Sequence, residues 1–172
     1  TITCVLPTNV TALTIEKDGV KITWNPISSV NGYVIYRRNL NDNSWVKITT
    51  ADADADSFID TTVASGGEYV YAVCPYVSTS ESVKAESAPI YYIKAPTGTV
   101  AENVTEGIKI TWEPSNGAYY YEILRATDNG EYVKIADVNA DDELVFIDAD
   151  VEWTQNYSYA VKAVSIRGES LV

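Results

Sequence analysis

Residues 19–24 read Gly-Val-Lys-Ile-Thr-Trp and are followed by Asn-Pro. The pattern returns at residues 107–112, which read Gly-Ile-Lys-Ile-Thr-Trp and are followed by Glu-Pro. In both stretches large apolar residues alternate with Lys and Thr, which is the period-two pattern of a strand with one buried face. Each stretch therefore predicts a β-strand that ends on a core tryptophan, Trp24 in the first and Trp112 in the second.

The spacing of these tryptophans reveals an internal repeat, because positions 24 and 112 differ by 88. The same offset relates further matched segments: Tyr33 and Ile35 with Tyr121 and Ile123, Phe58-Ile59-Asp60 with Phe146-Ile147-Asp148, and residues 69–73 with 157–161. A repeat of this length suits a complete small domain duplicated in tandem. We therefore place domain 1 at residues 1–94 and domain 2 at residues 95–172.

Short strand patterns separated by turn residues fill both units. We predict strands at 9–15, 19–24, 32–38, 45–49, 57–60, 68–76 and 87–93, then at 98–104, 107–112, 119–126, 131–136, 143–148, 156–164 and 168–172. About seven short strands in under 100 residues are typical of an antiparallel sandwich. The predicted fold class is all-β, with two tandem seven-stranded antiparallel β-sandwiches.

Each unit resembles a fibronectin type III domain. The shared features are a proline before the first strand (Pro7, Pro96), the Trp ending the second strand, a Tyr in the third (Tyr33, Tyr121) and Tyr-x-Tyr-x-Val in the penultimate one. The resemblance covers nearly the whole chain and implies an immunoglobulin-like sandwich. The amino-acid sequences of the strands are also similar to those of such modules in secreted or surface proteins of Gram-positive bacteria.

The resemblance implies structural roles for the repeated residues. Trp24 and Trp112 would fill the two cores, and Tyr69 and Tyr157 would be tyrosine corners that bond back to the main chain. The apolar partners in the first unit would be Val20, Ile22, Ile35, Ile48, Phe58, Val63, Tyr71 and Val73, with their counterparts in the second.

Composition excludes several classes of function. The chain has 172 residues, a net charge of −12 and no His. An acidic surface repels phosphate backbones and anionic membranes, so no nucleic-acid partner is expected. The apolar runs are far shorter than about 20 residues, so no direct membrane insertion is expected. Without His, catalysis by Ser-His-Asp or Cys-His sets is excluded, and we predict no enzyme activity.

The two cysteines and an acidic loop leave alternatives open. Cys4 and Cys74 either form a disulfide or remain separate thiols. Asp52, Asp54 and Asp56 alternate with alanines, as in the first half of a calcium loop. Ser57 and Val63 depart from the EF-hand pattern, so a solvated loop is the default and calcium the alternative; no other cofactor or metal is expected. Residues 167–169 read Arg-Gly-Glu, for which a tight turn is expected rather than a receptor motif.

Surplus aromatic residues are the candidate binding groups. They are Trp45, Trp153, Tyr119 and Tyr120, since sugar faces stack on exposed rings. By topology we expect Tyr119 and Tyr120 to brace the junction between the domains. In the first unit the loops 25–31, 51–56 and 78–85 should converge at one end, where binding often occurs.

We therefore expect non-catalytic spacer and presentation modules within a larger secreted or cell-surface protein. Their partners would be neighbouring domains of the same polypeptide. The alternative is a protein- or glycan-binding adhesion module that uses the loops or the exposed aromatics. A cytoplasmic scaffold is a third interpretation.

Overall fold

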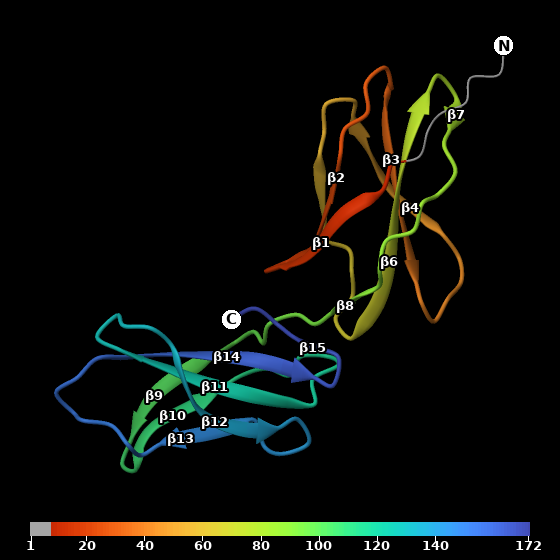
Figure 1. The fold of residues 1–172 in the computed structure, drawn as a ribbon. Coiled ribbons are helices and arrows are strands. Elements are labelled where there is room, and N and C mark those ends of the chain that lie inside the picture. The colour runs from red at the N-terminus through yellow and green to blue at the C-terminus, as the bar shows by residue number, and fades with distance from the viewer. Residues whose placement is uncertain (1–7) are drawn as a thin grey trace. The chain divides into compact units, whose positions relative to one another are not determined.

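The computed structural model describes residues 8–172, and in that range the secondary structure consists of strands without helices (Figure 1). The chain divides into two compact units, one ending at Tyr92 and the other beginning at Ile93. Residues 8–172 include no helix long and apolar enough to span a membrane.

The first unit contains two antiparallel sheets. One has the order β1-β2-β5, and the other has the order β4-β3-β6-β7 with β8 also paired to β6. The strands are β1 (Val10–Glu16), β2 (Gly19–Trp24), β3 (Gly32–Asn39), β4 (Val46–Asp52), β5 (Ser57–Asp60), β6 (Gly67–Val77), β7 (Ser80–Glu81) and β8 (Ile90–Tyr92).

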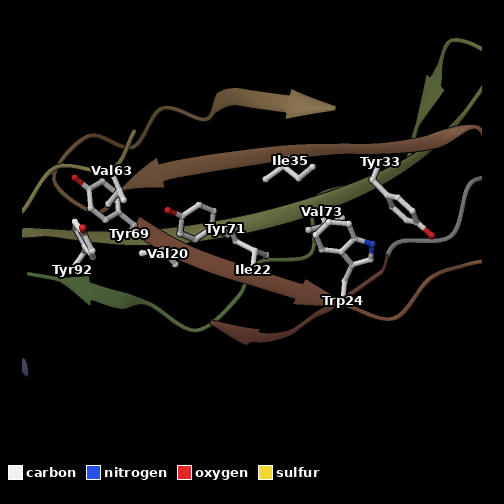
Figure 2. Packing of buried hydrophobic residues seen from close by; sticks show 10 residues of the cluster. All are labelled: Val20, Ile22, Trp24, Tyr33, Ile35, Val63, Tyr69, Tyr71, Val73 and Tyr92. Carbon is white, nitrogen blue, oxygen red and sulfur yellow. The ribbon is translucent and has the colours of Figure 1, made fainter. Parts of the chain in front are cut away.

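The alternation in β2 places its apolar residues in the core, as predicted. Val20 and Ile22 are fully buried and Trp24 is 2% exposed, whereas Lys21 and Thr23 are partly exposed. The Trp24 ring packs against Tyr33 with centroids 5.4 Å apart. Figure 2 shows the cluster, whose buried members are Val20, Ile22, Trp24, Tyr33, Ile35, Val63, Tyr69, Tyr71, Val73 and Tyr92.

Two predicted core residues of the first unit are less buried than expected. Phe58 is half-buried and packs against the cluster, while Ile48 is half-buried and outside it. The reason is that Ile48 lies on β4 and Phe58 on β5, and each of these is an edge strand of its sheet. A residue on an edge strand has a neighbouring strand on one side only, so its side chain stays partly in contact with solvent.

Both tyrosine corners are confirmed. The Tyr69 hydroxyl accepts the Ala64 N–H at 3.1 Å and donates to the Ala64 carbonyl at 3.1 Å. In the second unit the Tyr157 hydroxyl accepts the Glu152 N–H at 2.9 Å. Each corner fixes the loop that precedes the longest strand of its unit.

The predicted last strand of the first unit, residues 87–93, is present but shorter, since β8 covers Ile90–Tyr92. Before it, the segment 82–89 is joined to β6 by an isolated bridge between Glu86 and Ala72. Pro89 lies in this segment and has no N–H to donate to a ladder. The Ser87 side chain accepts the Tyr71 N–H at 3.0 Å in place of a backbone carbonyl.

The second unit is built in the same way. Its sheets have the orders β13-β10-β9 and β12-β11-β14-β15. The strands are β9 (Val100–Val104), β10 (Gly107–Thr111), β11 (Tyr120–Thr127), β12 (Val133–Asn139), β13 (Val145–Asp148), β14 (Tyr157–Ser165) and β15 (Gly168–Glu169). Trp112 is 5% exposed and packs on Tyr121 with centroids 5.5 Å apart. The predicted all-β sandwich class is thus confirmed.

Candidate binding surface

The outer face of the β4-β3-β6-β7 sheet is unusual because it is buried. Side chains alternate across a strand, so Val34, Ala72 and Cys74 lie on the face away from the core. Val34 is nevertheless only 3% exposed, and Ala72 and Cys74 are fully buried. Val34 and Cys74 are direct cross-strand partners. A second layer of side chains must therefore cover this face.

Aromatic and cationic side chains provide that layer, which we call the outer cover. It consists of Tyr36, Arg38, Trp45, Glu81, Lys84 and Glu86. The Arg38 guanidinium lies 5.3 Å from the centre of the Trp45 ring, and the Lys84 ammonium lies 3.9 Å from the centre of the Tyr36 ring. Such cation–π pairs are worth about 0.5–1 kcal/mol at exposed sites and more when desolvated.

The two carboxylates of the outer cover form hydrogen bonds with its residues on β3. The Tyr36 hydroxyl donates to Glu81 at 2.8 Å, and Arg38 donates to Glu86 at 2.6 Å. Burial, followed by the hydrogen bond to Glu81 and its negative charge, raises the pKa of Tyr36 to about 12. Burial also raises the pKa of the Cys74 thiol, so this group stays protonated and unreactive beneath the cover.

A small hollow opens beside the outer cover. It has a volume of about 130 Å³. The lining residues are Val34, Lys47, Thr50, Tyr76, Ser78, Thr79 and Glu81. The hydroxyl, ammonium and carboxylate groups of this lining can form hydrogen bonds with a polar ligand. The Tyr76 ring can stack on an apolar face of the same ligand.

The equivalent face of the second unit carries a row of ion pairs, with the Tyr120 ring 5.8 Å from the Lys134 ammonium. Lys134 lies 2.9 Å from both Glu122 and Asp137, and Lys162 lies 3.0 Å from Glu169 and 4.0 Å from Glu122. Hydrogen bonds to Asp137 and Glu122 raise the pKa of Lys134. We call this row of alternating charges across four strands the ion-pair ladder.

The four predicted aromatic candidates have different surroundings. Trp45 is half-buried in the outer cover, and its role in binding stays a prediction. Trp153 is 68% exposed and Tyr119 is 66% exposed. Tyr120 is half-buried, meets the Tyr119 ring at 6.4 Å and lies 5.8 Å from the Lys134 ammonium.

The structure brings Tyr119 and Tyr120 together, whereas Trp45 and Trp153 belong to different units. The predicted bracing of the domain junction by the two tyrosines stays a prediction.

The acidic loop does not gather its carboxylates. Asp52 belongs to β4, and Asp52, Asp54 and Asp56 are all exposed. Asp56 accepts a hydrogen bond from the Ser57 hydroxyl at 3.0 Å. Within residues 8–172 no three acidic or cysteine side chains are grouped to hold a metal ion.

The two alternatives for Cys4 and Cys74, a disulfide or separate thiols, involve Cys4, which lies outside the described part of the chain. Cys74 is a free thiol in the described range.

The segment 78–85 is a hairpin rather than the long flexible loop that its serines suggest. Val77 pairs with Ser80 and Tyr76 with Glu81, so the turn is Ser78-Thr79. Ser78 has a φ of 56°, in the left-handed region, and its N–H donates to the Asn31 side chain at 2.7 Å. This bond joins the loop after β2 to the hairpin, as the predicted convergence of loops requires.

The Arg-Gly-Glu stretch forms the expected turn. Gly168 and Glu169 make up β15, and the Ser165 hydroxyl accepts the N–H groups of Arg167 and Gly168 at 3.0 and 2.9 Å. Glu169 is engaged with Lys162 in the ion-pair ladder, so its carboxylate is directed to the sheet.

The sequence analysis did not predict a cluster of hydrogen-bonded side chains around a buried carboxylate, that of Asp60. Asp60 on β5 is fully buried and accepts hydrogen bonds from Arg37 of β3 at 2.7 Å and from the Tyr71 hydroxyl of β6 at 3.0 Å. It also accepts the Thr62 N–H at 2.9 Å and the Thr62 hydroxyl at 2.7 Å. Since β5 belongs to one sheet and β3 and β6 to the other, the cluster ties the two sheets together.

The pKa of Asp60 reflects competing effects. Burial acts to raise it, but the hydrogen bonds from Thr62, the Arg37 charge and the Tyr71 hydroxyl outweigh burial and hold the pKa of Asp60 below its ordinary value. The same desolvation, with the Asp60 charge, raises the pKa of Tyr71. The cluster is therefore an ionised carboxylate whose two oxygens both accept hydrogen bonds.

The second unit repeats this tie. Asp148 on β13 accepts hydrogen bonds from Arg125 of β11 at 2.9 Å and from the Tyr159 hydroxyl of β14 at 2.8 Å. Each arginine also stacks on the corner tyrosine, Arg37 on Tyr69 at 5.2 Å and Arg125 on Tyr157 at 5.4 Å. The signal was present in the sequence, because the Arg, Asp and Tyr positions all recur at the repeat offset.

Two antiparallel sheets per unit, repeated with the same core and the same tie, define a tandem β-sandwich protein. No family model matches the chain. Among solved structures, the chain is similar to a two-domain fibronectin type III segment from chicken tenascin. The identity is 14%, the TM-score is 0.54, and the match covers 96% of this chain and 94% of that chain.

Two further solved structures are similar to this chain. One contains the FN1–FN3 domains of chicken CNTN1, with 16% identity, a TM-score of 0.42, and coverage of 96% of this chain and 62% of that chain. The other is an FN3 domain of human collagen XX, with 18% identity, a TM-score of 0.41, and coverage of 49% and 93%. On the tenascin match, the fold is that of tandem fibronectin type III domains, as the sequence predicts.

Proposed function

We propose that the two units are non-catalytic spacer and presentation modules of a larger secreted or cell-surface protein. The observation that carries this proposal is the buried tie between the sheets, which is present in both units. Neighbouring domains of the same polypeptide would be the partners. A Gram-positive bacterial source and calcium binding by the loop 51–56 stay predictions.

The tie suits a load-bearing role for a physical reason. Sliding or separating the sheets of the first unit would pull Arg37 from Asp60 and leave a buried carboxylate without its cation. Removing one partner of such a pair typically costs about 3–5 kcal/mol. The tyrosine corner adds a local restraint next to the tie, because Arg37 also stacks on Tyr69.

Single-molecule force spectroscopy on the 172-residue chain tests this function. We expect two separate unfolding events, each releasing roughly 290 Å of chain, from about 80 residues at ~3.6 Å each. Asp60→Asn should lower the force of one event and Asp148→Asn that of the other. A single low-force extension, or forces unchanged in both variants, would contradict a load-bearing role.

A second candidate function is protein or glycan binding by the first unit. The observation that favours it is the outer cover with its adjoining hollow. Trp45 has an aromatic counterpart in the second unit, Tyr132, whereas Tyr36 and Arg38 have no equivalent there. At the matching positions the second unit has Leu124 for Tyr36 and Ala126 for Arg38.

A glycan array and a protein-array screen test this second function. A ligand of the outer cover should be lost with Trp45→Ala and retained with Trp153→Ala, because Trp153 is an exposed ring in the other unit. A ligand lost only with Trp153→Ala would instead place binding on the second unit. If neither array gives a reproducible ligand, the binding function is contradicted and the spacer function stands alone.

A further inference from the structure

A lysine beside the hollow of the first unit lacks the ion pairs that its counterpart makes in the second unit. Lys47 on β4 and Lys134 on β12 are equivalent, because each lies next to the same register shift in the same strand pair. Lys134 lies 2.9 Å from a carboxylate oxygen of Glu122 and 2.9 Å from one of Asp137. Lys47 is exposed, and within the described part of the chain it forms no ion pair.

One apolar and one hydroxyl residue replace the two carboxylates in the first unit. Glu122 pairs with Asp137 across β11 and β12, and the equivalent pair across β3 and β4 is Val34 with Thr50. Val34 and Thr50 line the hollow together with Lys47. The place that carboxylates occupy in the second unit is therefore part of the hollow in the first.

The wall of the hollow formed by β6 and its turn is held in place by packing and hydrogen bonds. Tyr76 pairs with Gly32, and its ring lies where a Gly32 side chain would stand, with Cε1 2.9 Å from the position of a Cβ. The Asn31 N–H donates to the Tyr76 carbonyl at 2.8 Å, and the Ser78 N–H donates to the Asn31 side chain at 2.7 Å. A wall that is already ordered loses little conformational entropy when a ligand binds.

Glu81 provides an acceptor on the side of the hollow away from Lys47. Its Oε2 accepts the Tyr36 hydroxyl at 2.8 Å, and no described residue donates to its Oε1. Since β4 and β7 stand at opposite ends of the order β4-β3-β6-β7, Lys47 and Glu81 face the hollow from opposite sides. A ligand that fits this arrangement has a negative group near Lys47 and hydroxyl groups toward Glu81.

We propose that the hollow binds a single sugar ring that carries a carboxylate, the shared chemistry of hexuronic and sialic acids. The sugar carboxylate pairs with Lys47 and takes the place of the carboxylates present in the second unit. The ring hydroxyls bond to Ser78 and Glu81, and the Tyr76 ring stacks on the apolar face of the sugar. This inference rests on the binding function proposed above for the first unit and names its ligand.

The size of the hollow sets the expected affinity. At about 130 Å³ it is smaller than the roughly 300–1,000 Å³ of sites that enclose drug-sized ligands. It therefore admits one ring, and the other rings of a glycan would lie outside. We expect dissociation constants on the order of 1 mM for single sugars.

The test titrates methyl glycosides into the ¹⁵N-labelled 172-residue chain at pH 7 and low salt, with amide shifts as the readout. The acidic probes are the methyl glycosides of glucuronic, galacturonic and mannuronic acid, and that of N-acetylneuraminic acid, which separates sialic from hexuronic acids. The matched controls are the methyl glycosides of glucose, galactose and mannose, which have CH₂OH in place of the carboxylate. We expect saturable shifts at Lys47, Thr50 and Ser78 with an acidic probe, and an affinity at least about tenfold lower for its neutral control.

Two variants connect the binding to Lys47. Lys47→Met removes the ammonium, and Thr50→Asp places a carboxylate beside it, as Asp137 stands beside Lys134 in the second unit. Each variant should weaken the acidic sugar at least about tenfold. Thr50→Asp should fold normally, because the second unit accepts the same arrangement. Lys134→Met is the control variant and should leave the affinity unchanged.

Three results would overturn the proposal. The first is the absence of saturable shifts at the hollow with every acidic glycoside at roughly 20 mM, well above the expected dissociation constant. The second is equal affinity for the neutral controls, or unchanged affinity in both Lys47→Met and Thr50→Asp. The third is tighter binding of hexaglutamate than of any acidic sugar, which would make the ligand an acidic protein segment.

The array screens separate failure of this inference from failure of the binding function. If an array ligand is lost with Trp45→Ala while no acidic glycoside binds the hollow, the named ligand is wrong and the binding function stands. If neither the arrays nor the glycosides give binding, both are wrong.

Discussion

Asp60→Asn removes one negative charge and almost no volume from a side chain that is fully buried in the first unit. The carboxylate accepts four hydrogen bonds, from Arg37, from Tyr71 and twice from Thr62. Arg37 and Tyr71 both donate to Oδ2, and an amide NH₂ at that position cannot accept from either. The variant therefore leaves the Arg37 cation without its counter-charge while its side chain is only 18% exposed.

The expected loss in the free energy of unfolding of the first unit is about 3–5 kcal/mol, the usual effect of breaking a buried pair by removing one partner. Domains of this size are commonly stable by only about 5–15 kcal/mol, so the change is a large fraction of the total. The second unit should keep its stability, because its own tie at Asp148 is untouched.

Urea unfolding followed by residue-resolved NMR reports the two units separately. The control is Asp54→Asn, the same chemical change on an exposed loop, with an expected effect within about 0.5 kcal/mol. Asp148→Asn is the matched variant and should destabilise the second unit. If Asp60→Asn costs less than about 1 kcal/mol, the buried pair does not hold the sheets together and the reasoning fails.

Three further predictions concern the core, the pH dependence and the thiol. Trp24→Ala should destabilise the first unit by about 3–5 kcal/mol, since it opens a cavity; an unchanged thermal melt would refute the core assignment. Folding lowers the pKa of Asp60, so the stability that its carboxylate contributes is present above about pH 4 and is lost as pH falls through the folded pKa. The difference in melting temperature between wild type and Asp60→Asn should therefore be smaller at pH 3 than at pH 7. In a Cys4→Ser background, Cys74 should react with a thiol reagent only after unfolding, because it is fully buried; rapid native labelling would contradict this.

Local patterns were sufficient to predict the sandwich. The predicted strands 19–24 and 57–60 coincide with β2 and β5, because alternation and flanking turn residues mark both ends. The tyrosine corner could also be predicted, since its hydroxyl bonds to a residue only five positions earlier. Both features depend on neighbours in sequence, which a pattern can record.

The missed features depend on residues far apart in sequence. The Ser78-Thr79 turn is supported by Asn31, and the segment before β8 is held to β6 by a hydrogen bond from the Tyr71 N–H to the Ser87 hydroxyl. The outer cover could not be predicted either, because it joins Arg38 of β3 to Trp45 and Glu86, which only the strand order brings together. The tie between Arg37 and Asp60 is different, since its recurrence in the repeat was a usable signal.

Comparison of the two units separates the features that both sandwiches share from those that differ between them. The core tryptophan, the tyrosine corner and the buried tie are the same in both units, so they meet a requirement that each sandwich has for itself. The outer sheet faces differ, with aromatic stacking in the first unit and the ion-pair ladder in the second. Folding alone does not require the aromatic cover, because the second unit forms the same sheet without it. The outer cover is therefore the part of the first unit on which a binding function would act, while the shared interior is sufficient for a spacer.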